Sequence, residues 1–226
     1  EIASCLVGSE MCIRDRHHTA QLNFTEIFKD FGALLKQKTF IIPMLLQGLT
    51  YVMLFSFASA GPFITQKIYS LSPQELGIIF SINSIGLIIM SQVTAKLVEY
   101  ISRFSLLILL TLIQIVGVVV IFVGLSLHLP IWVLIVGFFL NVCPVTGIGP
   151  LSFALAMESR TGGSGNASSL LGLFQFILGG IMSPLVGIQG QYSFIPYVSV
   201  LIITTFIIIM LEILLKYNLR STKKLH

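Results

Sequence analysis

The sequence predicts an all-α membrane protein with six transmembrane helices. Of its 226 residues, 55% are hydrophobic and 10% are charged, whereas soluble domains carry about 25% charged residues. The mean hydropathy is +0.97. Nine acidic and thirteen basic residues are too few to cover a water-soluble fold of this size, so most of the chain is expected to lie in lipid.

Six apolar runs are long enough to cross a bilayer as helices, which takes about 17–25 residues. They are too long for membrane β-strands of about 9–11 residues, and they do not alternate in polarity. Between the first two runs, Ser72 precedes Pro73 and is followed by Glu75 three positions on, which predicts a helix start with a capping box. His128-Leu129-Pro130 and Gln189-Gly190-Gln191 predict further turns. The predicted spans are 40–64, 76–96, 104–127, 131–157, 167–188 and 194–215.

The basic residues predict the orientation of these spans, because Lys and Arg collect on the cytoplasmic side. Six crossings place both termini on one side, and only Lys67 falls on the other. We therefore expect both termini in the cytoplasm of a bacterial cell, in its inner membrane. The scattered basic residues form no patch that would indicate nucleic-acid binding. The side with both termini holds Lys29, Lys36, Lys38, Lys96, Arg103, Arg160, Lys216, Arg220, Lys223 and Lys224.

Outside the spans, the chain divides into short segments. Residues 1–16, EIASCLVGSEMCIRDR, resemble a spurious translated tail, and we interpret them as non-native; a native cytoplasmic extension is the alternative. Residues 17–38 are expected to form a cytoplasmic linker with an amphipathic helix, since 21–38 shows helical spacing of apolar residues. Residues 39–216 form the six-helix unit, and 217–226 a basic cytoplasmic tail. Cys5, Cys12 and Cys143 match no disulfide or zinc pattern, so no metal is predicted.

The segment SRTGGSGNASSLLG, 159–172, has the composition of a flexible linker. On a helix, however, small residues from 165 to 187 recur at steps of three or four and form one stripe. Such stripes let a neighbouring helix approach closely in lipid, although Gly and Ser are also tolerated in any membrane helix. We expect helix packing at Gly165, Ser168, Gly172, Gly179, Ser183 and Gly187.

The six spans are not equivalent in polarity. The third and sixth are nearly continuous Ile, Leu and Val and are expected to face lipid, whereas the other four carry polar residues. Polar side chains in a membrane usually face a bundle interior or an aqueous cavity, although they can also merely tie helices together. The candidates for a substrate cavity are Gln47, Tyr51 and Phe55, which share one helix face, and Asn83, Asn141 and Gln175.

Two Gly-Pro pairs and two glutamates within or next to the spans also call for an interpretation. Gly61-Pro62 and Gly149-Pro150 are the predicted bend or gating points, because proline removes a backbone hydrogen bond. Glu158 lies close to Arg160, and Glu212 is expected to pair with Lys216 at i,i+4. Neither carboxylate is expected near the middle of the membrane.

Two stretches resemble the Bcr/CflA drug-resistance branch of the major facilitator superfamily. Residues 56–92 contain Ala60-Gly61-Pro62-Phe63, Ser72-Pro73-Gln74 and Gly77-x-x-Phe80-x-x-Asn83, as in the seventh and eighth helices of that branch. Residues 147–180 resemble its tenth and eleventh helices, with Gly165-x-Ala167-Ser168-x-Leu170-Leu171-Gly172-x-x-Gln175-Phe176. The resemblance covers about 20–216 and departs at Gly61 and Leu151.

The resemblance implies a proton-driven exporter of twelve helices, built from three-helix inverted repeats, of which this chain is the C-terminal half. Its partners would be the lipid bilayer, the absent N-terminal six-helix half and a small amphipathic or drug-like substrate. The proton carrier would lie in the absent half, and the proton gradient would replace any cofactor. The alternative is a self-contained six-helix protein that acts as an oligomeric transporter, channel or assembly subunit. An enzyme is not expected, because Ser56 and Ser59 have no His or Lys near them in their span.

Overall fold

The computed structural model describes residues 24–158, 164–188 and 193–223, and these are almost entirely helical. Six helical segments are long and apolar enough to cross a membrane, which confirms the six predicted spans and the all-α class. Each begins or ends within a few residues of its predicted bounds. The segments are Lys38–Ile68, Pro73–Leu97, Arg103–Ser126, Ile131–Glu158, Ser164–Gly187 and Ile195–Asn218.

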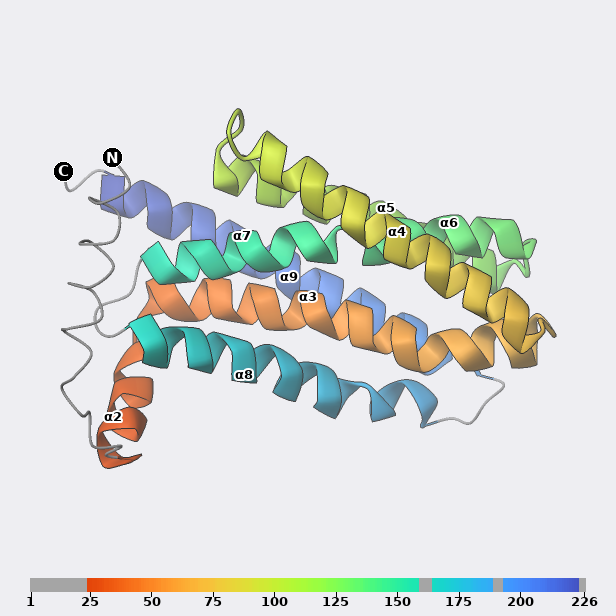
Figure 1. Ribbon diagram of the computed structural model, residues 1–226, viewed down its shortest axis with the longest axis horizontal. Helices are drawn as coiled ribbons and strands as arrows, with labels where there is room; N and C mark the ends of the chain where they lie inside the picture. Colours follow the sequence, from red (N-terminus) through yellow and green to blue (C-terminus); the bar gives the residue numbers. More distant parts are fainter. Residues whose placement is uncertain (1–23, 159–163, 189–192, 224–226) are drawn as a thin grey trace, which may run out of the picture.

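Helix α3, Lys38–Phe63, is the centre of the bundle. It runs between α8, Ser164–Met182, on one side and α7, Val145–Glu158, and α9, Ile195–Lys223, on the other (Figure 1). In the most apolar window of this span, 72% of the residues are buried, the largest share of any span. A central position explains why α3 carries polar side chains: they face other helices rather than lipid.

The next spans begin at side-chain caps that the sequence encodes. At the start of α4, Pro73–Leu97, the Ser72 hydroxyl accepts from the Glu75 backbone N–H at 3.3 Å, and the Ser72 N–H donates to Glu75 Oε2 at 2.8 Å. This is the predicted capping box, with Pro73 in the first turn. Ser102 caps α5, Arg103–Ser126, by accepting from the backbone N–H of Ser105 at 3.2 Å. Helix α6, Ile131–Val142, follows Pro130.

A short helix, α2, Phe24–Leu34, lies across one end of the bundle (Figure 1). We call this end the α2 end. Leu34 is buried in a small cluster with residues of α3, α7 and α8, and Phe31 packs against it. The predicted amphipathic helix therefore exists, but it stops at Leu34, and a turn over Leu35 and Lys36 leads into α3. The buried members of the cluster are Leu34, Phe40, Met44, Ala156, Ala167, Leu170 and Leu171.

The helices continue through both predicted bend points, and the fourth span is interrupted at another proline. The first span passes through Gly61 and Pro62 without ending and becomes a π-helical turn, η2, over Ile64–Ile68. The fourth span continues through Gly149-Pro150 and is interrupted instead at Cys143-Pro144, between α6 and α7. Pro144 lacks the N–H that would bond to residue 140, so it ends the α6 ladder, while its carbonyl starts α7 by accepting from Gly147 and Ile148.

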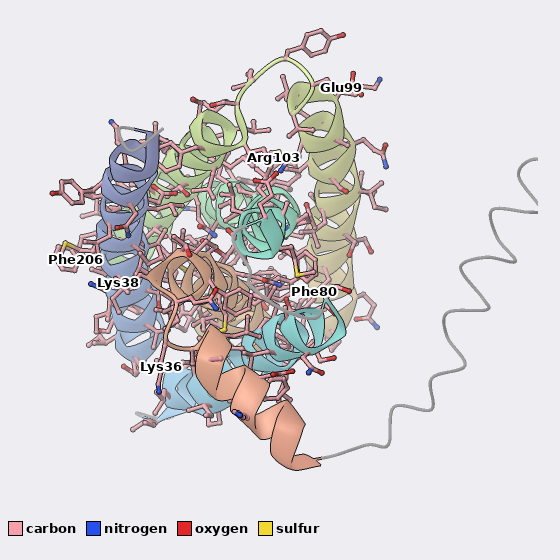
Figure 2. The ribbon with its side chains drawn as sticks, turned by 90° about the vertical axis from the view of Figure 1, so that its left-hand side faces the viewer. Lys36, Lys38, Phe80, Glu99, Arg103 and Phe206 are labelled. Atoms are coloured by element: carbon pink, nitrogen blue, oxygen red, sulfur yellow. The ribbon has the colours of Figure 1, made fainter. Side chains whose placement is uncertain are left out.

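The exposure of the spans also departs from expectation. In the most apolar stretches of the spans that contain α5 and α9, 44% of the residues are buried. The corresponding share is 17% for α4 and 22% for the span that contains α8. The second and fifth spans, rather than the third and sixth, thus show the most surface in this chain. The reason is their position at the edges of the bundle, where α4 rests on α6 and α7 and α8 rests on α3 (Figure 2).

The two ends of the bundle differ in charge. Among the described side chains, Lys29, Lys36, Lys38, Lys96, Arg103 and Lys216 gather at the α2 end, and Lys67 lies at the opposite end. At that opposite end, the Tyr69 hydroxyl donates to the Leu129 carbonyl at 2.9 Å and joins the turns after η2 and α5. Burial raises the pKa of the Tyr69 phenol, so it remains a protonated donor at neutral pH.

Candidate functional site

The contact between α3 and α8 brings several of the candidate residues together. We call it the α3–α8 seam and define it by Gln47, Tyr51 and Phe55 of α3 with Gln175 and Phe176 of α8. Gln47 Nε2 donates to Gln175 Oε1 at 2.6 Å, across 128 residues of sequence. Gln47 is only 5% exposed, and its own Oε1 atom has no hydrogen-bond partner. The seam therefore retains an unused acceptor next to an amide pair.

Aromatic rings continue the seam away from this amide pair. Phe176 is 59% exposed, and its ring lies edge-on to two rings of α3. Its centroid is 6.5 Å from that of Tyr51 and 6.1 Å from that of Phe55. These are ordinary separations for attractive aromatic pairs. The rings of Tyr51 and Phe55 follow the one-face spacing of residues 47, 51 and 55. Phe176, which was not among the predicted cavity residues, adds the third ring.

Two glycines let these rings approach the neighbouring helices. A Cβ atom at Gly179 would lie 2.2 Å from Phe55 Cδ2, and one at Gly149 would lie 3.0 Å from Tyr51 Cε2. A side chain at Gly179 would force the Phe55 ring to move. Gly149 thus serves as the surface against which Tyr51 packs. Gly61, the other predicted bend glycine, lies in a looser contact, 3.5 Å from the Phe80 ring.

Some residues of the small-residue stripe, 165–187, pack closely against a neighbouring helix, and others have open space beside them. Gly179 packs as described, and the Ser183 carbonyl accepts a bond from the Ser59 hydroxyl at 3.3 Å. At Gly165, Gly172 and Gly187 an added Cβ would meet nothing within 4 Å. Ser168 bonds back to the Gly165 carbonyl of its own helix at 3.0 Å. A side chain at Gly165, Gly172 or Gly187 would therefore find room within the described chain.

The hydrogen bonds of Asn83 and Asn141 lead to residues outside the seam. Asn83 is 2% exposed, and its side-chain amide donates to the Ile79 carbonyl of its own helix at 2.9 Å. Its backbone carbonyl accepts from the thiol of Cys143, which lies between α6 and α7. Asn141 is fully buried, and its backbone oxygen accepts from Gln114 Nε2 at 3.1 Å. The structure therefore joins Gln175 with the α3 face and separates the two asparagines from it.

The carboxylates have partners other than those expected. Glu158 forms an ion pair with Arg103, which joins the end of α7 to the start of α5 (Figure 2); Arg160 lies outside the described residues. Glu212 does not pair with Lys216: it is 8% exposed and accepts from the Thr111 hydroxyl of α5 at 2.6 Å. Helix periodicity could not reveal this bond, because it joins residues 101 positions apart.

The chemistry that the seam offers is binding rather than bond-making. It combines amide donors and acceptors with aromatic rings, a combination that fits an apolar ligand carrying a few polar groups. In the ranges the structure describes, no three His, Cys, Asp or Glu side chains come close enough to hold a metal ion. The seam has no carboxylate, thiol or imidazole of its own.

These features define a polytopic membrane protein with a polar and aromatic helix contact at its centre. The sequence profile of the Major Facilitator Superfamily matches residues 10–184, and the chain belongs to that family. The match begins within the segment 1–16, which lies outside the described residues. The family consists of transporters, so the chain is not an enzyme, as predicted.

Two curated relatives place the chain further within the family. It is 31% identical over 179 residues to a Bacillus subtilis (strain 168) protein described as "Uncharacterized MFS-type transporter YdgK". The aligned residues cover 79% of this chain and 44% of that protein. It is 27% identical over 165 residues to a "Bicyclomycin resistance protein homolog" of Haemophilus influenzae, covering 73% of this chain and 42% of that protein. The chain thus spans less than half the length of either relative.

Proposed function

We propose that the chain is the C-terminal half of a proton-coupled multidrug efflux transporter of the Bcr/CflA branch, working by alternating access. The observation that carries this proposal is the α3–α8 seam, where the buried Gln47, bonded to the half-buried Gln175, meets a partly exposed aromatic cluster on the central helix of a transporter-family bundle. The relative described as a bicyclomycin resistance protein homolog supports export of a drug-like compound. Such a substrate would place apolar surface on the three rings and polar groups on Gln47 and Gln175.

The distribution of basic residues supports an orientation of the chain in the membrane. The lysines and arginine at the α2 end favour the cytoplasmic side of a bacterial inner membrane, and both termini would lie there. In this orientation the seam would run from the cytoplasmic side towards the middle of the bilayer. The lipid bilayer and a small amphipathic substrate are then the immediate partners.

The absent N-terminal six-helix half is the third proposed partner. The chain spans 44% and 42% of its two relatives. Its α4 and α8 windows are the least buried of all six spans, and both present large apolar side chains such as Ile85 and Ile181. A second group of helices resting on these edges would bury that surface and enclose the seam between the two halves.

Efflux in a host without its own drug exporters tests the proposal. The complete native reading frame that contains this chain should lower the intracellular accumulation of bicyclomycin, and an uncoupler that dissipates the proton gradient should abolish the effect. Replacing Tyr51 or Phe176 by Ala removes a ring from the seam and should reduce efflux about tenfold, the equivalent of about 1.4 kcal/mol. Phe206→Ala, on the outer face of α9 (Figure 2), is the matched control and should leave efflux unchanged.

Three outcomes would contradict parts of this proposal. Equal efflux by the Tyr51, Phe176 and Phe206 variants would remove the seam from substrate binding. Efflux that persists with the uncoupler would remove proton coupling. A native frame that encodes only these six spans would favour the alternative, a six-helix protein that works as an oligomer.

A further inference from the structure

A buried carboxyl lies between α5 and α9, away from the α3–α8 seam. Glu212 is 8% exposed in a helix rich in Ile and Leu, and its Oε1 atom accepts from the Thr111 hydroxyl at 2.6 Å. A carboxylate buried in apolar surroundings is strongly unfavourable unless it is paired with a cation or gains a proton. Ionisable side chains inside membrane helices therefore mark ion or proton pathways more often than structural contacts.

No cation compensates this carboxyl in the described part of the chain. Among the described side chains, the other titratable groups on α9 and on the helices packed against it do not pair with Glu212. Lys38 and Lys216 are exposed, Arg103 pairs with Glu158, and the phenols carry no positive charge. Arg103 begins α5 eight residues before Thr111, which is about 12 Å along the helix. The groups concerned are Lys38 and Tyr51 of α3, Arg103 of α5, and Tyr197, Lys216 and Tyr217 of α9.

A row of buried polar groups extends from Glu212 into the bundle. Gln114 lies one turn beyond Thr111 on α5, and its Nε2 atom donates to the Asn141 backbone carbonyl of α6 at 3.1 Å. The Asn141 side chain lies beside the Tyr197 hydroxyl, on the same helix as Glu212. Tyr197 and Glu212 are fifteen residues apart, so the row covers about 22 Å along the bundle, most of a hydrocarbon core about 30 Å thick.

The far end of this row has unused hydrogen-bonding capacity. Both polar side-chain atoms of Asn141 and the Tyr197 hydroxyl lack a partner although both residues are fully buried. Fully buried polar atoms without partners are rare, and water supplies the missing bonds where several converge. The Phe138 ring, 6.4 Å from that of Tyr197, separates this site from the central helix. Water beside Asn141 and Tyr197 would give protons a polar route through an apolar interior.

We propose that Glu212 is a proton-binding site of this chain, held by Thr111 and connected to the opposite side of the bundle by the row of Gln114, Asn141 and Tyr197. The carboxyl binds one proton and releases it unchanged, with no other bond made or broken. In the protonated state, the neutral acid is compatible with its apolar surroundings. In the ionised state, an uncompensated charge lies between α5 and α9 and favours their separation. Proton binding and the packing of these two helices are thereby coupled.

Infrared spectroscopy of the full chain in lipid nanodiscs tests this directly. At neutral pH we expect a protonated-carboxyl C=O stretching band, and Glu212→Gln should remove it. Glutamine keeps an oxygen that accepts from Thr111, so this variant preserves the hydrogen bond while it eliminates proton binding. Glu99→Gln, in the exposed turn after α4 (Figure 2), is the matched control and should leave the band intact.

Two further variants keep the test decisive. Thr111→Val removes the hydrogen bond to the carboxyl, so the band should move to higher wavenumber without disappearing. Glu212→Asp retains a carboxyl and should shift the band, which guards against loss of the signal through misfolding. Absence of the band in the folded wild-type chain, or its survival in Glu212→Gln, would overturn the proposal.

This inference stands apart from the proposed export of drugs, because the infrared band requires no substrate. If the band follows Glu212 but the uncoupler leaves efflux unchanged, proton-coupled efflux fails and the proton site remains. If efflux depends on the proton gradient but the band is absent, the proton carrier lies elsewhere in the transporter.

Discussion

At the residue scale, identical side chains in this protein have different roles, and only their neighbours distinguish them. Gly179 and Gly172 belong to the same stripe of α8, yet an added Cβ meets the Phe55 ring at one and open space at the other. Gly149, a predicted bend point, lies against the Tyr51 ring and leaves room for it. The amide pair of Gln47 and Gln175 likewise depends on the meeting of two distant helix faces.

The two glycines give a direct comparison. Gly179→Val should lower the free energy of unfolding by about 1–3 kcal/mol more than Gly172→Val, because it overpacks the contact with Phe55. Both changes carry the same helix propensity, so the difference isolates the packing term. Thermal unfolding in detergent, followed by far-ultraviolet circular dichroism, measures it. Phe55→Ala should rescue the Gly179 variant; equal midpoints for both valine variants would contradict the close contact.

At the element scale, the bundle is held by contacts that tie whole helices together. Helix α2 docks through Leu34 and Phe31, the α6–α7 break falls at Pro144, and Arg103 and Glu158 join α5 to α7. Helical spacing predicts that α2 is amphipathic, but not which surface receives it. Proline predicts a weak point, yet Pro62 and Pro150 are accommodated within helices and Pro144 is not.

The docking of α2 is expected to depend on one of two adjacent leucines. Leu34 is 4% exposed and Leu35 is 43% exposed. Leu34→Ala should destabilise the docked state by about 2–5 kcal/mol, as for other buried leucines, and Leu35→Ala should change it by less than about 0.5 kcal/mol. Hydrogen exchange of the amides over residues 29–37 is the measurement. Equal protection in both variants would show that α2 is not held by its buried face.

The ion pair between Arg103 and Glu158 should contribute little, because both side chains are about half exposed, at 44% and 57%. We expect a coupling of about 0.2–1 kcal/mol in a double-mutant cycle with Arg103→Ala and Glu158→Ala. Added salt should reduce it, since the Debye length is about 10 Å at 0.1 M ionic strength. The exchange of both residues, Arg103→Glu with Glu158→Arg, should restore stability lost in either charge reversal. Additive effects in the cycle would mean that the pair is energetically neutral.

At the scale of the whole molecule, the charge asymmetry and the edge positions of α4 and α8 matter most. The basic side chains at the α2 end favour one orientation in the membrane, and the two least buried spans leave the edges of the bundle open. A single packed unit of six helices therefore has a defined direction and two under-packed sides. Both properties suit a half of a larger transporter.

Cysteine labelling in whole cells tests the orientation. In a variant without Cys5, Cys12 and Cys143, Lys67→Cys should react with an impermeant thiol reagent added outside the inner membrane. Lys96→Cys and Lys216→Cys, at the α2 end, should react only after the cells are permeabilised. Labelling of the second pair from outside would reverse the proposed cytoplasmic location of the termini.

The sequence by itself determined the number of spans, their approximate bounds and the capping box at Ser72. These depend on local hydropathy and on hydrogen bonds between residues a few positions apart. It also identified the α3 face of Gln47, Tyr51 and Phe55, because one helix period sets that face. The choice of Gln175 rather than Asn83 or Asn141 as its partner, the break at Pro144 and the Thr111–Glu212 bond were decided by tertiary structure. Each depends on which helices become neighbours, and in a membrane that choice rests on close packing between surfaces whose local hydrophobicity is nearly uniform.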